Sequence, residues 1–331
     1  MRFVQRSCLP ALFLLSCSLT QAQSARSEVW IGPNDPTHGG APDFWDMLRP
    51  DAPWQRAKSR IDVFEIQQNL VTNGPPEQLR KLYAYLKENH IELAVGIGML
   101  TWSEQCGKHV EGYVPPGGSA YVANRIKWLG GELAYIDVDE ALIFGRYYTG
   151  KNACRSTMDA LAADVAENFR AYRAVFPNAR LGSSEPAGPH PDKPDDNEWQ
   201  RYLSAWIDGL EARTGEPLAF FHEDITNWKI PLSAYIPKLS ALLRKRHIPF
   251  GIYDIASDGN GPDDAWARSV QANIRAFRAL DMPEPDQLLI CTWYNYPTHN
   301  LPETSPSSLT HQVNFYFDEF ARREAPNSRA R

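Results

Sequence analysis

Long apolar runs, basic charge and low-complexity tracts are all scarce in this 331-residue chain. Beyond the first two dozen residues, no apolar stretch approaches the roughly 18 residues that a membrane-spanning helix needs. The formal charge of −6, from 34 basic and 40 acidic residues, offers no electrostatic footprint for nucleic acid or for an anionic lipid surface. We therefore predict a mature chain that is one soluble unit, with no nucleic-acid partner and no membrane insertion.

Several catalytic signatures are also missing. The chain has no Gly-x-Ser-x-Gly elbow and no glycine-rich phosphate cradle. Residues 257–264, SDGNGPDD, alternate oxygen ligands but lack the EF-hand pattern and its terminal glutamate. The eight histidines are scattered without the His-x-His that opens metal-dependent hydrolase barrels. The histidines placed near the predicted carboxyl ends of the strands are His38, His109, His222 and His299. We expect neither a metal nor a cofactor.

The first residues have the pattern of an export signal. Arg2 and Arg6 supply the positive end, residues 9–15 form an apolar core, and residues 21–25 offer small-residue cleavage sites. This pattern predicts a signal peptide over residues 1–22. Its removal takes away two arginines and no acid, so the formal charge moves from −6 to −8.

A second processing route is open. Residues 14–17, Leu-Leu-Ser-Cys, resemble a bacterial lipoprotein cleavage box, which would place a lipid on Cys17. We favour ordinary cleavage because a good alanine-containing site follows. The protein is then periplasmic or secreted, and with the lipid anchor it is an outer-membrane lipoprotein.

Only three cysteines follow the leader. Cys106 and Cys154 lie in loop-like sequence, whereas Cys291 lies within the apolar run LLICTW. Export makes a disulfide permissible. We predict a Cys106–Cys154 bridge and a buried free thiol at Cys291; the alternative is that all three stay reduced.

Eight apolar runs of strand length alternate with longer segments that have apolar residues at helical spacing, such as Leu79, Leu82 and Leu86. Strand-then-helix units of this kind predict a (β/α)8 TIM barrel, here a single domain over residues 28–323 followed by a flexible tail, 324–331. A doubly wound open sheet is the alternative, but the first run lacks its phosphate-binding glycine turn. The runs are residues 28–33, 60–66, 91–99, 132–138, 179–185, 218–224, 249–255 and 288–294.

Acids and aromatic residues follow the carboxyl ends of these strands, where barrel enzymes hold their chemistry. Aromatic faces stack on sugar rings while carboxylates bind hydroxyl groups, so this combination suits a carbohydrate site. For any single aromatic residue, packing in the core or rim is an equal alternative. The predicted substrate-binding residues are Glu65, Trp102, Asp139, His222, Trp228, Tyr253 and Trp293.

Cleavage of a glycosidic bond needs two carboxyl groups, one to protonate the leaving oxygen and one to attack the sugar or activate water. Glu140 and Glu185, at the ends of adjacent strands, are our preferred pair, with Asp224 and Asp254 as further candidates. Crowded carboxylates raise at least one pKa, which keeps an acid protonated near neutral pH. Capping, salt bridging or exposure explains many single acids, but four successive strands ending in acid favour a site.

The strand order, the export signal and the pair Asp139-Glu140 at the end of the fourth strand resemble the clan A glycoside hydrolases. In that group an Asn-Glu pair at this place supplies the acid/base, so the resemblance implies this role for Glu140. The family nucleophile, a glutamate ending strand 7, is replaced here by Asp254. The segment 292–306 after strand 8 also resembles the Trp-bearing strand of such enzymes. The resemblance spans about residues 28–323, and its motifs are short.

We therefore interpret the chain as an exported glycoside hydrolase that acts on a polysaccharide or oligosaccharide, and expect a monomer. The alternative is a non-catalytic carbohydrate-binding or cell-envelope barrel that retains the acids as hydroxyl acceptors. The departure at Asp254 favours the alternative slightly, whereas the acid-rich strand ends favour an enzyme.

Overall fold

The computed structural model describes residues 27–188, 198–225, 230–257, 261–293 and 295–324. The predicted signal peptide, Trp228 and the predicted tail beyond Glu324 lie outside these ranges. Among the described residues, no helix combines the length and apolar character needed to cross a bilayer.

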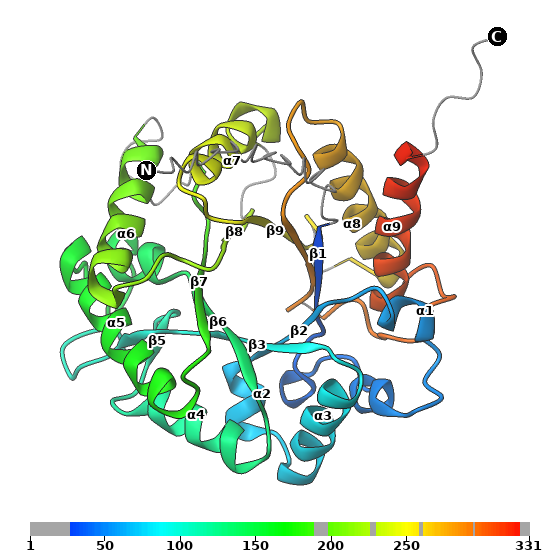
Figure 1. Ribbon diagram of the computed structural model, residues 1–331, viewed down its shortest axis with the longest axis horizontal. Helices are drawn as coiled ribbons and strands as arrows, with labels where there is room; N and C mark the ends of the chain where they lie inside the picture. Colours follow the sequence, from blue (N-terminus) through cyan, green and yellow to red (C-terminus); the bar gives the residue numbers. More distant parts are fainter. Residues whose placement is uncertain (1–26, 189–197, 226–229, 258–260, 294, 325–331) are drawn as a thin grey trace, which may run out of the picture.

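Eight parallel strands close into a barrel in the order β1-β10-β9-β8-β7-β6-β3-β2, which confirms the predicted TIM barrel. Viewed close to the barrel axis, the strands surround the centre and the helices form the outer ring (Figure 1). A further pair, β4 (Leu100–Thr101) and β5 (Tyr113–Val114), lies beyond the end of β3. The barrel strands are β1 (Glu28–Gly32), β2 (Val63–Gln67), β3 (Glu92–Ile97), β6 (Leu133–Asp139), β7 (Arg180–Glu185), β8 (Phe221–Glu223), β9 (Phe250–Asp254) and β10 (Gln287–Cys291).

Helices connect the strands on the outside. Their buried faces follow the predicted spacing, as in α3, where Leu79, Leu82 and Leu86 are all buried. The α-helices are α1 (Gln55–Lys58), α2 (Gln68–Asn73), α3 (Pro76–Glu88), α4 (Gly118–Trp128), α5 (Met158–Val175), α6 (Trp199–Thr214), α7 (Ile236–Lys245), α8 (Asp263–Arg278) and α9 (Leu309–Glu324).

The first unit departs from the prediction of a full helix after every strand. Between β1 and β2 the chain forms only 3₁₀ turns at Pro36–His38 and Phe44–Leu48 and the single turn α1. The proline- and glycine-rich sequence of residues 33–53 explains this, because proline lacks the amide donor and glycine loses the most backbone entropy in a helix.

Two apolar layers hold the fold together. The larger packs the outward strand residues against the helices, and the smaller fills the barrel interior. At the amino-terminal end of the interior, the Trp30 ring lies 4.8 Å from that of Tyr135 and 4.9 Å from that of Phe220. Gly182 makes room for this plug, since a Cβ there would lie 2.1 Å from the Phe220 ring. Apolar side chains thus fill the barrel interior at its amino-terminal end, and polar side chains line it at its carboxyl-terminal end.

Candidate active site

Strand alternation decides which side chains reach the barrel mouth. In β6, Ile136 and Val138 pack in the outer layer and Tyr135 in the inner one, so Asp137 and Asp139 also face inward. The other inward-facing polar residues, assigned in the same way, are Glu65, Ser184, His222, Asp224 and Tyr253. The structure therefore brings together acids from β2, β6 and the end of β8.

Glu140 lies where β6 ends, and its backbone turns there. Its φ of 47° is in the left-handed region, which costs a residue with a Cβ about 1 kcal/mol or more. The peptide is held on both sides, because Glu140 donates its amide to the Ser184 carbonyl and its own carbonyl accepts from the Phe144 amide. The side chain is 8% exposed. Burial and the charges of Asp224 and Asp139 raise its pKa to about 11, so it is a proton-holding acid at neutral pH.

Asp224 is a second buried acid that influences Glu140. It lies just past β8 and is buried, and its charge raises the pKa of Glu140. Burial, with the charges of Glu111 and Asp137, raises its pKa to about 7. Two carboxyl groups with pKa values pushed apart are the usual arrangement of a catalytic acid and its ionised partner.

Glu111 is a rim acid that the sequence did not reveal. It is exposed in the loop between β4 and β5, and its charge raises the pKa of Asp139, Glu140 and Asp224. Nothing in the local sequence marks it, because it follows no barrel strand directly. Only the folded loop brings it to the acids of β6 and β8.

Asp137 is the centre of a buried hydrogen-bond network. The Ser184 hydroxyl lies 2.7 and 2.6 Å from its two oxygens and donates one hydrogen bond that they share, and Tyr253 donates to Oδ2 at 2.6 Å. The Tyr253 hydroxyl also lies 3.3 Å from Oε1 of Glu65. Burial raises the pKa of Asp137 to about 6, and burial with neighbouring carboxylates raises that of Glu65 well above its ordinary value. The network fixes Tyr253 and Asp137 beneath the mouth.

His222 is neutral and oriented from below. Its Nε2 lies 2.8 Å from Oε1 of Gln287, whose own amide donates to Glu28. The ring hydrogen therefore sits on Nε2, and the bare Nδ1 faces Asp137 at 3.9 Å. Burial lowers the His222 pKa to about 3. His222 is therefore an uncharged hydrogen-bonding group in the barrel interior.

Glu185, the preferred partner of Glu140 in the sequence analysis, points outward. Because Ser184 faces the interior, the next side chain turns toward the helices, where it is fully buried. Its oxygens accept from the Leu142 amide at 2.6 Å and the Ile143 amide at 3.2 Å. These bonds cap the π-helical turn Ile143–Tyr147 that follows Glu140. The geometry favours a positioning role for Glu185.

Asp254 also lies apart from the mouth. Tyr253 packs in the interior, so the following side chain points toward α8 and Asn273, and neither Asp254 oxygen has a hydrogen-bond partner among the described residues. Asp254 is fully buried, and burial raises its pKa well above the ordinary value, with no other carboxylate among the causes. The position of the family nucleophile is therefore occupied by an acid turned away from Glu140.

The predicted aromatic residues divide. Trp293 is 43% exposed at the end of β10, with its ring 5.9 Å from that of Tyr253, and it forms a platform beside the acids. Trp102 follows β4, is partly buried against the outer core, and lies 6.5 Å from the His109 ring. Trp293 is thus the better placed of these two for a sugar ring.

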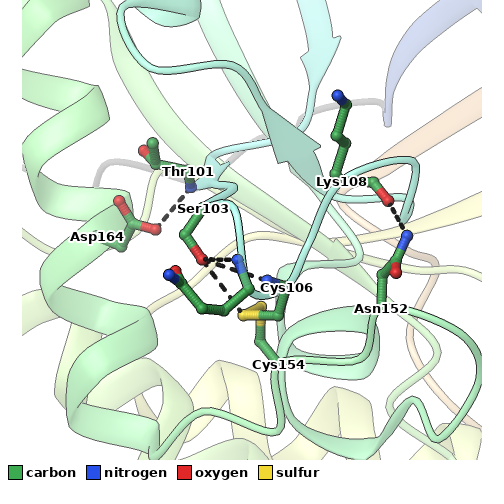
Figure 2. The surroundings of a disulfide bond; sticks show 8 residues. Thr101, Ser103, Cys106, Lys108, Asn152, Cys154 and Asp164 are labelled. Carbon is green, nitrogen blue, oxygen red and sulfur yellow. Dashed lines mark hydrogen bonds between the residues drawn. A yellow bond between two sulfur atoms is a disulfide. The ribbon is translucent and has the colours of Figure 1, made fainter.

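The predicted disulfide is confirmed. Cys106 and Cys154 are bonded with their Cα atoms 5.0 Å apart, and Cys291 is a buried free thiol. Figure 2 shows the bridge joining two rim loops, beside the 2.7 Å bond that the Asn152 amide donates to the Lys108 carbonyl. The bridge anchors the loop that carries Glu111.

Metal-ligand groupings are absent from the part of the chain that the structure describes: no three His, Cys, Asp or Glu side chains are arranged to hold an ion. His222 is engaged by Gln287, and His299 lies 3.2 Å from Asp263 and 3.1 Å from Ser305.

The raised pKa values make stability depend on pH. Asp137 and Asp224 titrate near 6 and 7 when folded, against a usual 3.8, so the native state binds more protons than the unfolded chain. Their stabilisation is complete below about pH 4 and is lost as pH rises through about 6 to 7. The two shifts together are about 5 pKa units, so at about 1.4 kcal/mol per unit the free energy of unfolding falls by roughly 7 kcal/mol. We expect the thermal unfolding midpoint, followed by circular dichroism, to drop between about pH 5 and pH 8.

The Asp224→Asn variant is the control for this pH dependence, because it removes one of the two titrations. Its midpoint should fall less than that of the native chain, and at the alkaline end it should be the more stable protein. A midpoint that stays level or rises with pH would show that the acids are not held in their protonated forms.

No protein-family model and no curated protein matches this chain. Similar solved structures include GH5_18 from Streptomyces cattleya in complex with GlcNAc, which is 17% identical with a TM-score of 0.53 over 93% of this chain and 82% of that one. A variant of it in complex with Manβ1-4GlcNAc is 17% identical with a TM-score of 0.51, over 90% of this chain and 81% of that one. A fungal β-1,4-galactanase is 8% identical with a TM-score of 0.50, over 87% of this chain and 99% of that one. The structural neighbours thus include glycosidases of the group that the sequence resembles, and at these identities the likeness establishes the barrel fold.

Proposed function

We propose that this protein is a glycoside hydrolase that cleaves a polysaccharide or oligosaccharide with Glu140 and Asp224. Glu140 donates its proton to the leaving glycosidic oxygen. Asp224, ionised above about pH 7, attacks the anomeric carbon or takes a proton from the attacking water. Asp139, beside Glu140, raises the pKa of that acid, and Trp293 offers a face for the sugar ring.

One observation carries the proposal: Glu140 is held in a left-handed turn at the end of β6, next to a second acid whose pKa is lower. Strained backbone concentrates at functional sites, because ordinary packing would select a residue that adopts the turn freely. Glycine or asparagine would serve a purely structural turn better. The strain at this position therefore supports a role for the Glu140 carboxyl group.

Purified mature protein incubated with a panel of bacterial and plant glycans tests the proposal. Release of reducing ends, followed by mass spectrometry of the products, is the expected result. Binding is measured on the same panel of glycans, and it separates a carbohydrate-binding protein from an enzyme. The Asp254 side chain, turned away from the mouth, favours that alternative, a carbohydrate-binding barrel, and binding to a glycan without released ends would establish it.

Export is part of the proposal. The amino-terminal pattern and the Cys106–Cys154 bridge both suit an oxidising compartment outside the cytoplasm. Periplasmic or secreted protein, or a form with lipid on Cys17, fits these observations, and fractionation of cells expressing the full chain distinguishes them. The monomeric state stays a prediction that light scattering tests.

A further inference from the structure

We infer that the substrate carries protonated amino groups, so that the site takes a glycan containing free, non-acetylated hexosamine residues. The inference rests on the proposed function, whose site it uses. Six side chains define the acidic mouth: Glu65, Glu111, Asp137, Asp139, Glu140 and Asp224.

The first argument is charge. Burial is the largest influence on the pKa of each of the six acids. For four of them, Glu65, Asp139, Glu140 and Asp224, the next influences are other carboxyl groups, such as Asp137 and Asp139 for Glu65 and Glu111 and Asp137 for Asp224. Among the described residues, no lysine or arginine appears with those leading influences, and His222 is neutral. The acids that ionise near neutral pH, Asp137 and Asp224, would repel a negatively charged sugar and attract a cation.

The second argument is the presence of buried acceptor oxygens with nothing bound to them. Oε2 of Glu65 and Oδ1 of Asp224 have no hydrogen-bond partner, although the two residues are only 2% and 7% exposed. Buried polar atoms are normally satisfied, so each of these two oxygens indicates a missing hydrogen-bond partner. An ammonium group provides three donors and no acceptor, which suits such oxygens.

The third argument is size. Glu65 lines a cavity of about 30 Å³ together with Gln67, Tyr253 and Trp293, which is room for one or two water-sized groups. A primary ammonium is of this size, whereas an acetamido group adds three heavy atoms. The neighbouring Trp293 ring also stabilises a cation over its face. The cavity thus favours a free ammonium group over an acetamido group both by charge and by volume.

Binding to the Glu140→Gln variant tests the inference without turnover. Glucosamine oligomers with β-1,4 and β-1,6 linkages and galactosamine oligomers with α-1,4 linkages are each titrated by calorimetry as free amine and as the N-acetylated form. At least one backbone should bind at least about tenfold more tightly as the free amine, because charge-assisted bonds and burial both favour it. Added salt should weaken only that form appreciably.

Further variants locate the effect. Glu65→Gln in the same background should remove most of the preference, whereas Glu132→Gln, an exposed acid at the opposite end of the barrel, should leave it unchanged. Equal or tighter binding of every N-acetylated form, or no binding of any free-amine form, overturns the inference. So does tight binding of Ca²⁺ or Mg²⁺ alone without an amine preference, which would assign the acids to a metal ion.

The two proposals fail separately. Cleavage of neutral or N-acetylated glycans with no amine preference would leave the hydrolase and remove the substrate assignment. Tight amine binding with no cleavage by the unaltered protein would leave the substrate assignment and remove the hydrolase.

Discussion

Replacing Glu140 with glutamine is expected to lower kcat by about 10³-fold while leaving the fold and sugar binding intact, because the amide keeps the shape but has no proton to give. The loss should be much smaller on an aryl glycoside whose leaving group needs no protonation. Steady-state kinetics on both substrates, with binding measured by calorimetry, checks this. The neutral amide also removes the buried acid's ionisation, so the variant should be at least as stable as the native protein at alkaline pH.

Glu132→Gln is the matched control for this variant, since Glu132 is an exposed glutamate paired with Lys87 on the opposite face. It should retain full activity. Unchanged turnover in Glu140→Gln, or an equal loss on natural and aryl substrates together with a lower unfolding midpoint, would remove Glu140 from the acid role.

Replacing Asp224 with asparagine is expected to reduce kcat by a similar factor of about 10³, because the carboxylate that attacks or activates water is lost. In the native protein, kcat/KM should rise with pH through about 7 as this carboxyl ionises, and fall only at alkaline pH where Glu140 loses its proton. The two steps belong to a coupled set of acids, so they are apparent values of the site. Any residual activity of the variant should lack the rise near pH 7.

Asp254→Asn separates this assignment from the one that the family resemblance implies. Asp254 points toward α8 and holds its proton, so an amide there should keep kcat within about tenfold of the native value. If Asp254→Asn abolishes turnover and Asp224→Asn does not, the family position is the working one and the pairing of Glu140 with Asp224 is wrong.

Much of the architecture was readable from the sequence because parallel barrel strands are buried on both faces and appear as apolar runs. All eight predicted runs are strands, and the disulfide and the buried thiol were identified from the loop or strand character of their surroundings. The acids at the strand ends were visible for the same reason. The missing full helix after β1 was a failure of the repeating pattern, where proline and glycine override it.

The choice among those acids was not readable. In residues 181–185 and 220–224, both alternating sets mix apolar and polar residues, so the pattern does not show which set faces the interior. The register of the closed barrel decides it: Ser184 and Asp224 face the axis, while Glu185 faces the helices. Glu111 reaches the mouth only through a loop anchored by a bond to Cys154, a contact distant in sequence.

The sequence by itself thus determined the barrel, the end of it that carries the acids, and the covalent link between two loops, because apolar runs, turns and isolated cysteines are local patterns. The tertiary structure alone decided which carboxyl groups meet, how strongly their pKa values rise, and that Glu140 turns into the mouth through a left-handed backbone. The physical reason is that strand alternation is local, whereas inward direction, burial and mutual repulsion depend on neighbours contributed by several strands.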